Sequence, residues 1–277
     1  MLLLTVITPV FNNVTYISVA IENYLSQQCA FSELLIIDGG STDGTKEVIA
    51  QFAKDHPSIR WVSEKDKGQS DAMNKGIRLA KGKYISFLNV DDYYSEGCLN
   101  EVCQILTENS NINYLVGDCN VWDQTGNLIY VNRPSKVKKY HVFSGYHFSV
   151  NPSAYFYQKS LHDKVGLYPL DNHYNMDLEM ILRFRRITTF DYFPKVWGNF
   201  RMLPNAKTFE DQASNRLEER KLKLIESVLS KQSKYIQLRV KLYQFERLYK
   251  PKFNYLIRKI HDKIIFEFSK MLNVFKK

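Results

Sequence analysis

ELLIIDGGSTDGT, residues 33–45, joins one expected element of secondary structure to the next. The apolar residues over 33–39 predict a strand. The Ser and Thr residues of STDGT are preferred N-cap residues, so we expect a helix over 44–56. The consecutive glycines between them let the backbone approach a bound molecule closely. This stretch therefore predicts a strand–turn–helix unit with a candidate binding turn in its middle.

The same alternation extends over the first 120 residues. Further strands are expected at 2–10, 59–64, 83–89 and 114–121, and further helices near 14–28, 69–80 and 95–107. Elements at this spacing predict βαβ units, and hence an α/β fold with a mostly parallel central sheet flanked by helices. Ligands of such sheets bind beyond the carboxyl ends of the strands.

Polar side chains follow four of these expected strands, in the segments TPVFNN, DGGSTDGT, SEKDKGQSDAMNKG and NVDDYY. Because parallel strands end at the same edge of a sheet, the four segments are expected to converge. In the last of them, Asp91 and Asp92 are adjacent. Two buried carboxylates raise each other's pKa, and a divalent cation such as Mg²⁺ or Mn²⁺ would remove this conflict. A solvent-exposed turn or a helix N-cap is the alternative for the pair.

The periodicity weakens after residue 120. The residues over 121–131 predict a hairpin around a glycine-containing turn, and 133–153 reads as an irregular aromatic loop. A helix is expected over 175–186 and a strand over 188–196. From about residue 208 the sequence is helical in pattern and rich in lysine.

Charge and cysteine content limit the function classes. Residues 216–277 carry 17 Lys and Arg against 6 Asp and Glu, a net charge of +11, whereas the rest of the chain carries 21 against 23, a net charge of −2. This asymmetry favours an appended surface-binding segment over a nucleic-acid enzyme. The four cysteines form no CxxC pair, so a zinc site or a disulfide framework is not expected, and a reducing compartment fits best.

No membrane-crossing segment is expected, because no apolar run reaches about 18 residues. The N-terminal residues read as a first strand rather than a signal peptide, since a basic n-region and a small-residue cleavage site are missing. These features predict a cytoplasmic location, with the inner face of the plasma membrane as a second option.

Four motifs in order resemble glycosyltransferase family 2, whose members are inverting enzymes with a GT-A fold: TVITPVFNN, LLIIDGGSTDGT, SEKDKGQSDAMNKGIRLAKGKYISFLNVDD and NMDLEMILRF. The resemblance implies a GT-A domain over 1–207, with a Rossmann-like nucleotide-sugar-binding half (1–120) and an acceptor half (121–207). The remaining 208–277 would form a helical extension. It also implies transfer of a sugar from a UDP- or GDP-linked donor to a saccharide or lipid-linked acceptor, in bacterial polysaccharide or glycolipid assembly.

The resemblance also implies roles for particular residues. The donor-binding residues would be Thr8, Pro9 and Phe11 in the nucleotide pocket, Asp38 at the nucleoside, and Asp66, Gly68 and Asp71 near the base and ribose. The metal-binding DxD-like motif corresponds to Asn89, Asp91 and Asp92, with Asp91 the preferred Mn²⁺ or Mg²⁺ ligand. Asn replaces Asp at its first position, which lowers the charge of the motif, but Asn89 would still bind the donor by accepting from a ribose hydroxyl.

Inversion at an anomeric carbon requires a carboxylate base on the face opposite the leaving group. It also requires positive charge at the departing diphosphate, which a metal ion supplies. The resemblance assigns the base to Asp177, with Glu179 as the alternative. Arg201 matches a family arginine that could contact the diphosphate, although Leu203 stands where a histidine is frequent, and an ordinary surface arginine is the competing interpretation.

Other interpretations stay open from the residues themselves. Asp38 could simply end its strand, and Asp66 and Asp71 could be surface charges near a helix N-terminus. His147 is expected in the acceptor pocket or in packing. For the whole chain, the alternatives are a sugar nucleotidyltransferase and a non-catalytic protein that binds a nucleotide-sugar or a membrane.

The segment 250–277 has the pattern of a basic amphipathic helix. Such a helix can lie in the interface of an anionic membrane. The alternatives are packing on the catalytic domain or on a second subunit of a homodimer.

Overall fold

The computed structural model describes residues 2–135, 138–145, 148–171, 175–203 and 216–249. The first part of the chain comprises β1 (Leu4–Val10), α1 (Val14–Ser26), β2 (Ser32–Asp38), α2 (Thr45–Asp55), β3 (Ile59–Ser63), α3 (Gln69–Leu79), β4 (Tyr84–Phe87), β5 (Tyr93–Tyr94) and α4 (Cys98–Glu108). After these come β6 (Tyr114–Trp122), β7 (Leu128–Asn132), α5 (Lys139–Phe143), η1 (Pro152–Ala154), β8 (Tyr155–Gln158), η2 (Lys159–Leu161), α6 (His162–Val165), α7 (Met176–Ile187), β9 (Asp191–Arg201) and α9 (Arg216–Ser230). A further helix covers 234–249.

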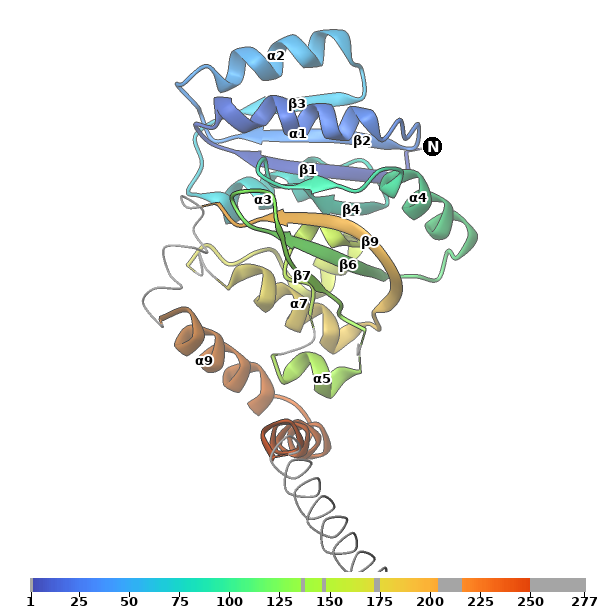
Figure 1. Ribbon diagram of the computed structural model, residues 1–277, viewed down its shortest axis with the longest axis vertical. Helices are drawn as coiled ribbons and strands as arrows, with labels where there is room; N and C mark the ends of the chain where they lie inside the picture. The colour runs from blue at the N-terminus through green and yellow to red at the C-terminus, as the bar shows by residue number, and fades with distance from the viewer. Residues whose placement is uncertain (1, 136–137, 146–147, 172–174, 204–215, 250–277) are drawn as a thin grey trace, which may run out of the picture.

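One nine-stranded sheet runs through the domain in the order β3-β2-β1-β4-β8-β6-β9-β5, with β7 paired to β6 (Figure 1). Strands β1 to β4 are parallel to one another. Their register sets Val10 beside Asp38 and Asp38 beside Ser63, so the polar segments that follow these strands share one edge. The α/β fold with a sheet flanked by helices, and the convergence of the strand ends, are confirmed.

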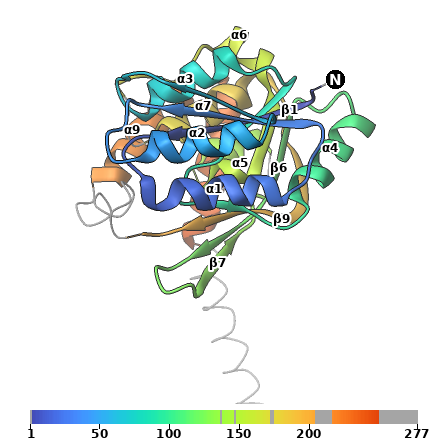
Figure 2. The same ribbon diagram turned by 90° about the horizontal axis from the view of Figure 1, so that it is seen from above.

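Side chains of the central strands alternate between two apolar layers. Val6 of β1 joins the cluster that contains Ile17 and Ile21 of α1. Its neighbour Ile7 joins the opposite cluster, which contains Met73 of α3. Figure 2 shows α1 and α3 on opposite sides of the sheet. A fully buried strand of this kind reads as a continuous apolar run in the sequence.

The structure departs from the expected elements in the second half of the chain. The loop expected over 133–153 contains the short helix α5, because Val142 and Phe143 reach the core. An unexpected strand, β8, lies between β4 and β6 and is antiparallel to both. The strand expected to end at residue 196 continues to Arg201, because its carboxyl half pairs with β6 as far as Trp122.

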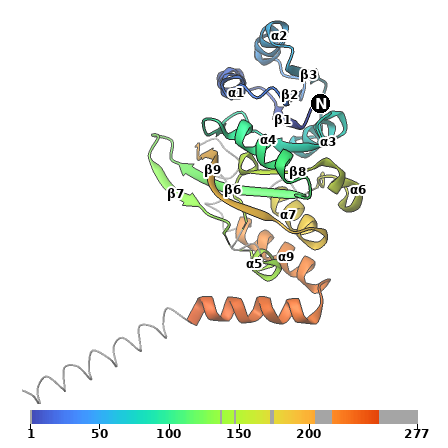
Figure 3. The same cartoon turned by 90° about the vertical axis from the view of Figure 1, so that its right-hand side faces the viewer.

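Two C-terminal helices pack below this domain. Ile225 of α9 and Val240 of the helix over 234–249 both belong to the core cluster that lies beside α7. Figure 3 shows the helix over 234–249 running beneath α5 and α9. The boundary expected at residue 207 and the tail over 250–277 lie outside the described residues. None of the helices in the described ranges combines the length and the apolar character needed to cross a bilayer.

Candidate active site

Asp38 ends β2 and closes the glycine turn that follows it. Its buried carboxylate accepts hydrogen bonds from Ser63 Oγ at 2.6 Å and from the N–H groups of Gly40 and Ser41, each at 3.1 Å. Gly40 has a φ of 87°, a conformation that glycine adopts without strain. These contacts give Asp38 the strand-ending role considered above, and its contact with a nucleoside stays a prediction.

Asp66 and Asp71 shape the loop before α3. Both are half-buried rather than free surface charges. Asp66 Oδ1 accepts from the N–H of Gly68 at 2.8 Å, and Asp71 Oδ2 accepts from the N–H of Lys67 at 3.1 Å. Asp66 also packs closely against the glycine turn. A Cβ added to Gly39 would lie only 2.6 Å from Asp66 Oδ2. The turn after β2 and the loop before α3 are therefore fitted against each other.

We expect Gly39→Ala to lower the free energy of unfolding by about 1–2 kcal/mol, because the added methyl group overpacks the contact with Asp66. The control is the double variant Gly39→Ala/Asp66→Ala, which removes the clashing carboxylate. Urea denaturation of the two single variants and the double variant gives the coupling energy. Additive effects would show that the two loops do not depend on this contact.

The NVDD turn after β4 gathers polar groups from three separate segments. Asp92 is buried, and its Oδ2 accepts from Asn89 Nδ2 at 2.9 Å and from Asn151 Nδ2 at 2.7 Å. Its Oδ1 accepts from the backbone N–H of Arg201 at 3.2 Å. The Asp91 carboxylate is half-buried and receives no hydrogen bond from any described side chain. Asp92 thus holds the turn together, whereas Asp91 keeps oxygens available for a ligand.

Burial raises the pKa of both carboxylates. The pKa of Asp92 rises to about 7, first because of burial and then because of the neighbouring Asp91 charge. The pKa of Asp91 is also raised by burial, although the Arg201 charge opposes this. The expected conflict between two adjacent carboxylates is therefore present, and the pair is not a solvated turn.

Arg201 lies inside this turn and is not a surface arginine. Its Nε donates to the backbone carbonyl of Asp91. Its guanidinium carbon lies 5.3 Å from the ring centroid of Tyr16 and 5.9 Å from that of Tyr93. Its Nη2 is buried and has no hydrogen-bond partner among the described residues. A buried donor without a partner is costly, so this N–H group is positioned to bind an anion.

The residues at the end of β1 differ in exposure. Thr8 and Pro9 are buried, and the Thr8 hydroxyl has no hydrogen-bond partner among the described residues. The Phe11 side chain is 61% exposed. The strand end therefore presents one unsatisfied polar group and one exposed aromatic ring.

Asp177, at the start of α7, lies among buried tyrosines. Tyr155 Oη donates to Asp177 Oδ1 at 3.4 Å, and Tyr168 forms a second hydrogen bond to the carboxylate. Burial raises the pKa of Asp177 to about 6, although both tyrosine bonds oppose this rise. A carboxyl group with such a pKa can accept a proton near neutral pH.

Glu179 lies two residues further along α7, and its environment is different. Its Oε1 pairs with Arg183 Nη2 one helical turn away. The same guanidinium donates to the carbonyl oxygens of Val165 and Leu167, at 3.4 and 3.2 Å. Glu179 thus pairs within α7 with an arginine that also joins α7 to the end of α6 and to Leu167 beyond it.

The first turn of α3 connects these groups. Gln69 Nε2 lies 3.3 Å from Asn89 Oδ1, on the NVDD side. Ser70 Oγ donates to the sulfur of Met176, the residue before Asp177, at 3.0 Å. The candidate metal-binding turn and the candidate base therefore flank the same helix start.

A second link, Asn151, is absent from the residues picked from the sequence. It donates to Asp92, and its Oδ1 accepts from the N–H of Ser153 at the start of η1. The same short segment continues to Tyr155, which contacts Asp177. The Asn-Pro pair at 151–152 is a turn signal that could have marked this position. His147 lies outside the described residues.

We expect Asn151→Asp to destabilise the fold at pH 8, because it sets a second carboxylate within 2.7 Å of Asp92. The loss in free energy of unfolding should be about 2–3 kcal/mol and should shrink toward pH 5, where the pair shares a proton. Thermal unfolding over this pH range measures it. The control is Asn132→Asp, on the half-buried end of β7, and an equal loss in both variants would contradict the role of Asn151.

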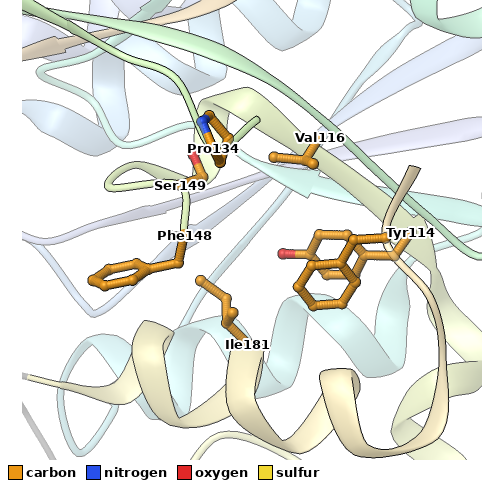
Figure 4. A pocket seen from close by; sticks show the side chains of 7 residues that line it. Tyr114, Val116, Pro134, Phe148, Ser149 and Ile181 are labelled. Atoms are coloured by element: carbon orange, nitrogen blue, oxygen red, sulfur yellow. The ribbon is translucent and has the colours of Figure 1, made fainter. Parts of the chain in front are cut away.

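A small apolar cavity lies on the α7 side of the sheet (Figure 4). Tyr114, Phe148, Ile181 and Phe190 line it, and Ser149 supplies a polar group. Its volume of about 10 Å³ corresponds to roughly one water molecule. It is too small for a sugar and is not the acceptor site.

The described residues contain no cluster of three or more histidine, cysteine, aspartate or glutamate side chains that could hold a metal ion by themselves. A Mg²⁺-like ion needs only one or two protein carboxylates when a diphosphate completes its shell. Asp91 fits this requirement, because its oxygens receive no hydrogen bond from a described side chain.

Comparison with solved structures agrees with the GT-A fold. Staphylococcus aureus TarS 1-349 in complex with UDP-GlcNAc has a TM-score of 0.69 and 14% identity, over 90% of this chain and 73% of that chain. The mannosyltransferase PcManGT from Pyrobaculum calidifontis, in complex with GDP-Man and Mn²⁺, has a TM-score of 0.57 and 16% identity, over 91% and 82%.

Sequence comparison identifies the family. Chondroitin synthase of Escherichia coli is 34% identical over 137 residues, which cover 46% of this chain and 18% of the synthase. The match thus spans under a fifth of that relative's length. The sequence profile of glycosyl transferase family 2 matches residues 5–164, more than half of the chain. The chain therefore belongs to glycosyl transferase family 2.

Proposed function

We propose that this protein is an inverting, metal-dependent enzyme that moves a sugar from a UDP- or GDP-linked donor to a hydroxyl group of a saccharide or lipid-linked acceptor. The observation that carries the proposal is the Arg201 guanidinium, which lies near the rings of Tyr16 and Tyr93 beside Asp91 and has a buried N–H group without a partner among the described residues. A fixed cation beside a carboxylate suits a leaving diphosphate and its counter-ion.

The donor would lie along the edge where β1, β2 and β4 end. The unpaired Thr8 hydroxyl and the exposed Phe11 ring are available to a nucleoside, the first for a hydrogen bond and the second for stacking. Asp38 would act mainly by fixing the glycine turn. The structural neighbours solved with UDP-GlcNAc and with GDP-Man support a donor of this class.

Asp91 would hold Mn²⁺ or Mg²⁺, and Asp92 would keep Asp91 and Arg201 in position. The ion would supply positive charge to the leaving diphosphate. Asn89 carries no charge and donates to Asp92. The NVDD turn thus has one acidic group fewer than a DxD motif would have. Arg201, which is bound to the Asp91 carbonyl, would add a fixed positive charge beside it.

Asp177 would remove the proton from the acceptor hydroxyl. Its pKa of about 6 leaves it ionised at neutral pH and basic enough to accept a proton in the transition state. Glu179 is less suited, because its carboxylate already forms an ion pair with Arg183. The acceptor would enter beside α7, with assembly of a cell-surface polysaccharide or glycolipid as the proposed setting, on the cytoplasmic side.

Calorimetric titration with UDP, GDP and UTP, with and without Mn²⁺, tests the donor assignment. We expect Mn²⁺ to strengthen diphosphate binding. Preference for the triphosphate would favour a nucleotidyltransferase, and absence of any nucleotide binding would favour a non-catalytic protein. The anomeric configuration of the product, read by NMR, then tests inversion.

A further inference from the structure

The helix over 234–249 has apolar residues on two opposite sides. One side packs against the domain through Ile236, Val240 and Tyr243. Val240 is fully buried, and the ring centroid of Tyr243 lies 4.7 Å from that of His141 in α5. Three apolar contacts at helical spacing are enough to explain why this helix lies against the domain.

The opposite side of this helix carries a second apolar stripe that is exposed. Its members recur every three or four residues and are Tyr235 (66% exposed), Leu238 (56%), Leu242 (46%), Phe245 (59%) and Tyr249 (50%). No described element covers them, and Figure 3 shows that the lower side of the helix faces away from the domain. Contiguous exposed apolar surface of this kind marks an interaction site rather than a structural need.

Basic side chains border this stripe. Exposed Lys234 and Lys241 flank it on one side of the helical wheel, Arg239 lies near its other border, and Glu246 is the only acidic residue between 234 and 249. The sequence then continues over 250–277 with eight Lys and Arg against two Asp and Glu. Lysine side chains beside an apolar stripe can bury their methylene groups along the lipid while their charged ends reach lipid phosphates.

We propose that the stripe over 235–249 docks on the surface of an anionic lipid membrane, with the helix axis parallel to that surface. Charge decides between a membrane and a second copy of the chain. A two-fold contact through this stripe would bring two segments of net charge +11 together, whereas an anionic surface attracts them. Tyr235, Phe245 and Tyr249 also suit the headgroup region, where aromatic rings concentrate. The proposal does not depend on the sugar-transfer site.

Sedimentation of the full-length protein with vesicles tests it. We expect binding to vesicles of phosphatidylglycerol and phosphatidylcholine, weak binding to phosphatidylcholine alone, and loss of binding as salt rises. Leu238→Asp/Leu242→Asp should weaken binding about a hundredfold, because it removes two leucines that would enter the lipid and adds repulsive charge. Lys234→Glu/Lys241→Glu should weaken it at least about tenfold.

The matched controls are Phe31→Asp, 55% exposed in the loop before β2, and Lys54→Glu on α2, and neither should change vesicle binding. Circular dichroism and thermal unfolding verify that each variant is folded. The fluorescence of the tryptophan introduced by Leu242→Trp should be quenched by brominated acyl chains. The unsubstituted protein is the reference for this measurement.

Full binding by the Leu238→Asp/Leu242→Asp variant, or no binding by the unsubstituted protein, would overturn the proposal. Equal binding to neutral and anionic vesicles would overturn its electrostatic part. A concentration-dependent dimer that the same double variant dissociates, together with absent vesicle binding, would assign the stripe to a second copy instead.

Discussion

Asp177→Asn should retain donor binding and lose sugar transfer by a factor of about 10²–10⁴, the range for removal of a general base. Asn keeps the size of the side chain and an oxygen that accepts from Tyr155, but it cannot take a proton. The measurement is the transfer rate beside the affinity for UDP or GDP. Glu179→Gln is the matched control, and a larger loss there than in Asp177→Asn would assign the base to Glu179.

The same substitution should stabilise the protein. In the folded state burial raises the pKa of Asp177 from 3.8 to about 6, so the folded protein holds this proton more tightly than the unfolded chain does. The free energy of unfolding therefore falls as pH rises from 3.8 to about 6, and the penalty persists above that pH. We expect Asp177→Asn to raise the free energy of unfolding by about 1–3 kcal/mol at pH 7.5 and to leave it almost unchanged near pH 4.

The pH dependence of transfer should follow the opposite direction. Only the ionised carboxylate can act as base, so the rate should rise with pH to a plateau, with a midpoint near 6. The transfer rate of the Asp177→Asn variant should not show this rise with pH. A pH-rate profile that keeps its midpoint in the variant would contradict the assignment.

Asp91→Ala should abolish the effect of Mn²⁺ on diphosphate binding, which we expect to be about tenfold to a hundredfold in the unsubstituted protein. The fold should tolerate the change, because no described side chain donates a hydrogen bond to this carboxylate and its burial already raises its pKa. Calorimetric titration with UDP or GDP, with and without Mn²⁺, measures the effect.

Asp92→Ala is the matched comparison for Asp91→Ala. It leaves Asn89 Nδ2, Asn151 Nδ2 and the Arg201 N–H without their acceptor, so it should lower the free energy of unfolding by about 2–4 kcal/mol. Retention of the Mn²⁺ effect in Asp91→Ala would remove that residue as metal ligand. Equal stability of the two variants would contradict the division of roles.

The first half of the fold was predictable because each element there has a local signal. Apolar runs and glycine turns fixed β1 to β4, and the edge they share brings Asp38 to the end of the sheet beside Ser63. The acidic pair Asp91 and Asp92 stood out as a strand ending in two like charges, and its raised pKa values agree with that expectation. The strands and the acidic pair could be predicted because each depends on residues that are close together in the sequence.

The second half was less predictable because its elements form through distant contacts. Tyr155–Gln158 becomes strand β8 only because β4 and β6 pair with it on either side. Asn151 matters through Asp92, 59 residues away, and Arg201 through Asp91, 110 residues away. Sequence propensity and periodicity carry no information about such distant pairs, so the sequence alone gives no role for Asn151 and allows two interpretations of Arg201.

The position of β8 has a consequence for how the molecule unfolds. Because β8 lies between β4 and β6, both of which precede it in the chain, neither residues 1–120 nor residues 121–207 contain a complete sheet by themselves. Heating should melt both portions in one calorimetric transition whose van't Hoff and calorimetric enthalpies agree. Separately expressed fragments of residues 1–120 and 121–207 should therefore gain structure only when mixed, because the two portions form one folding unit.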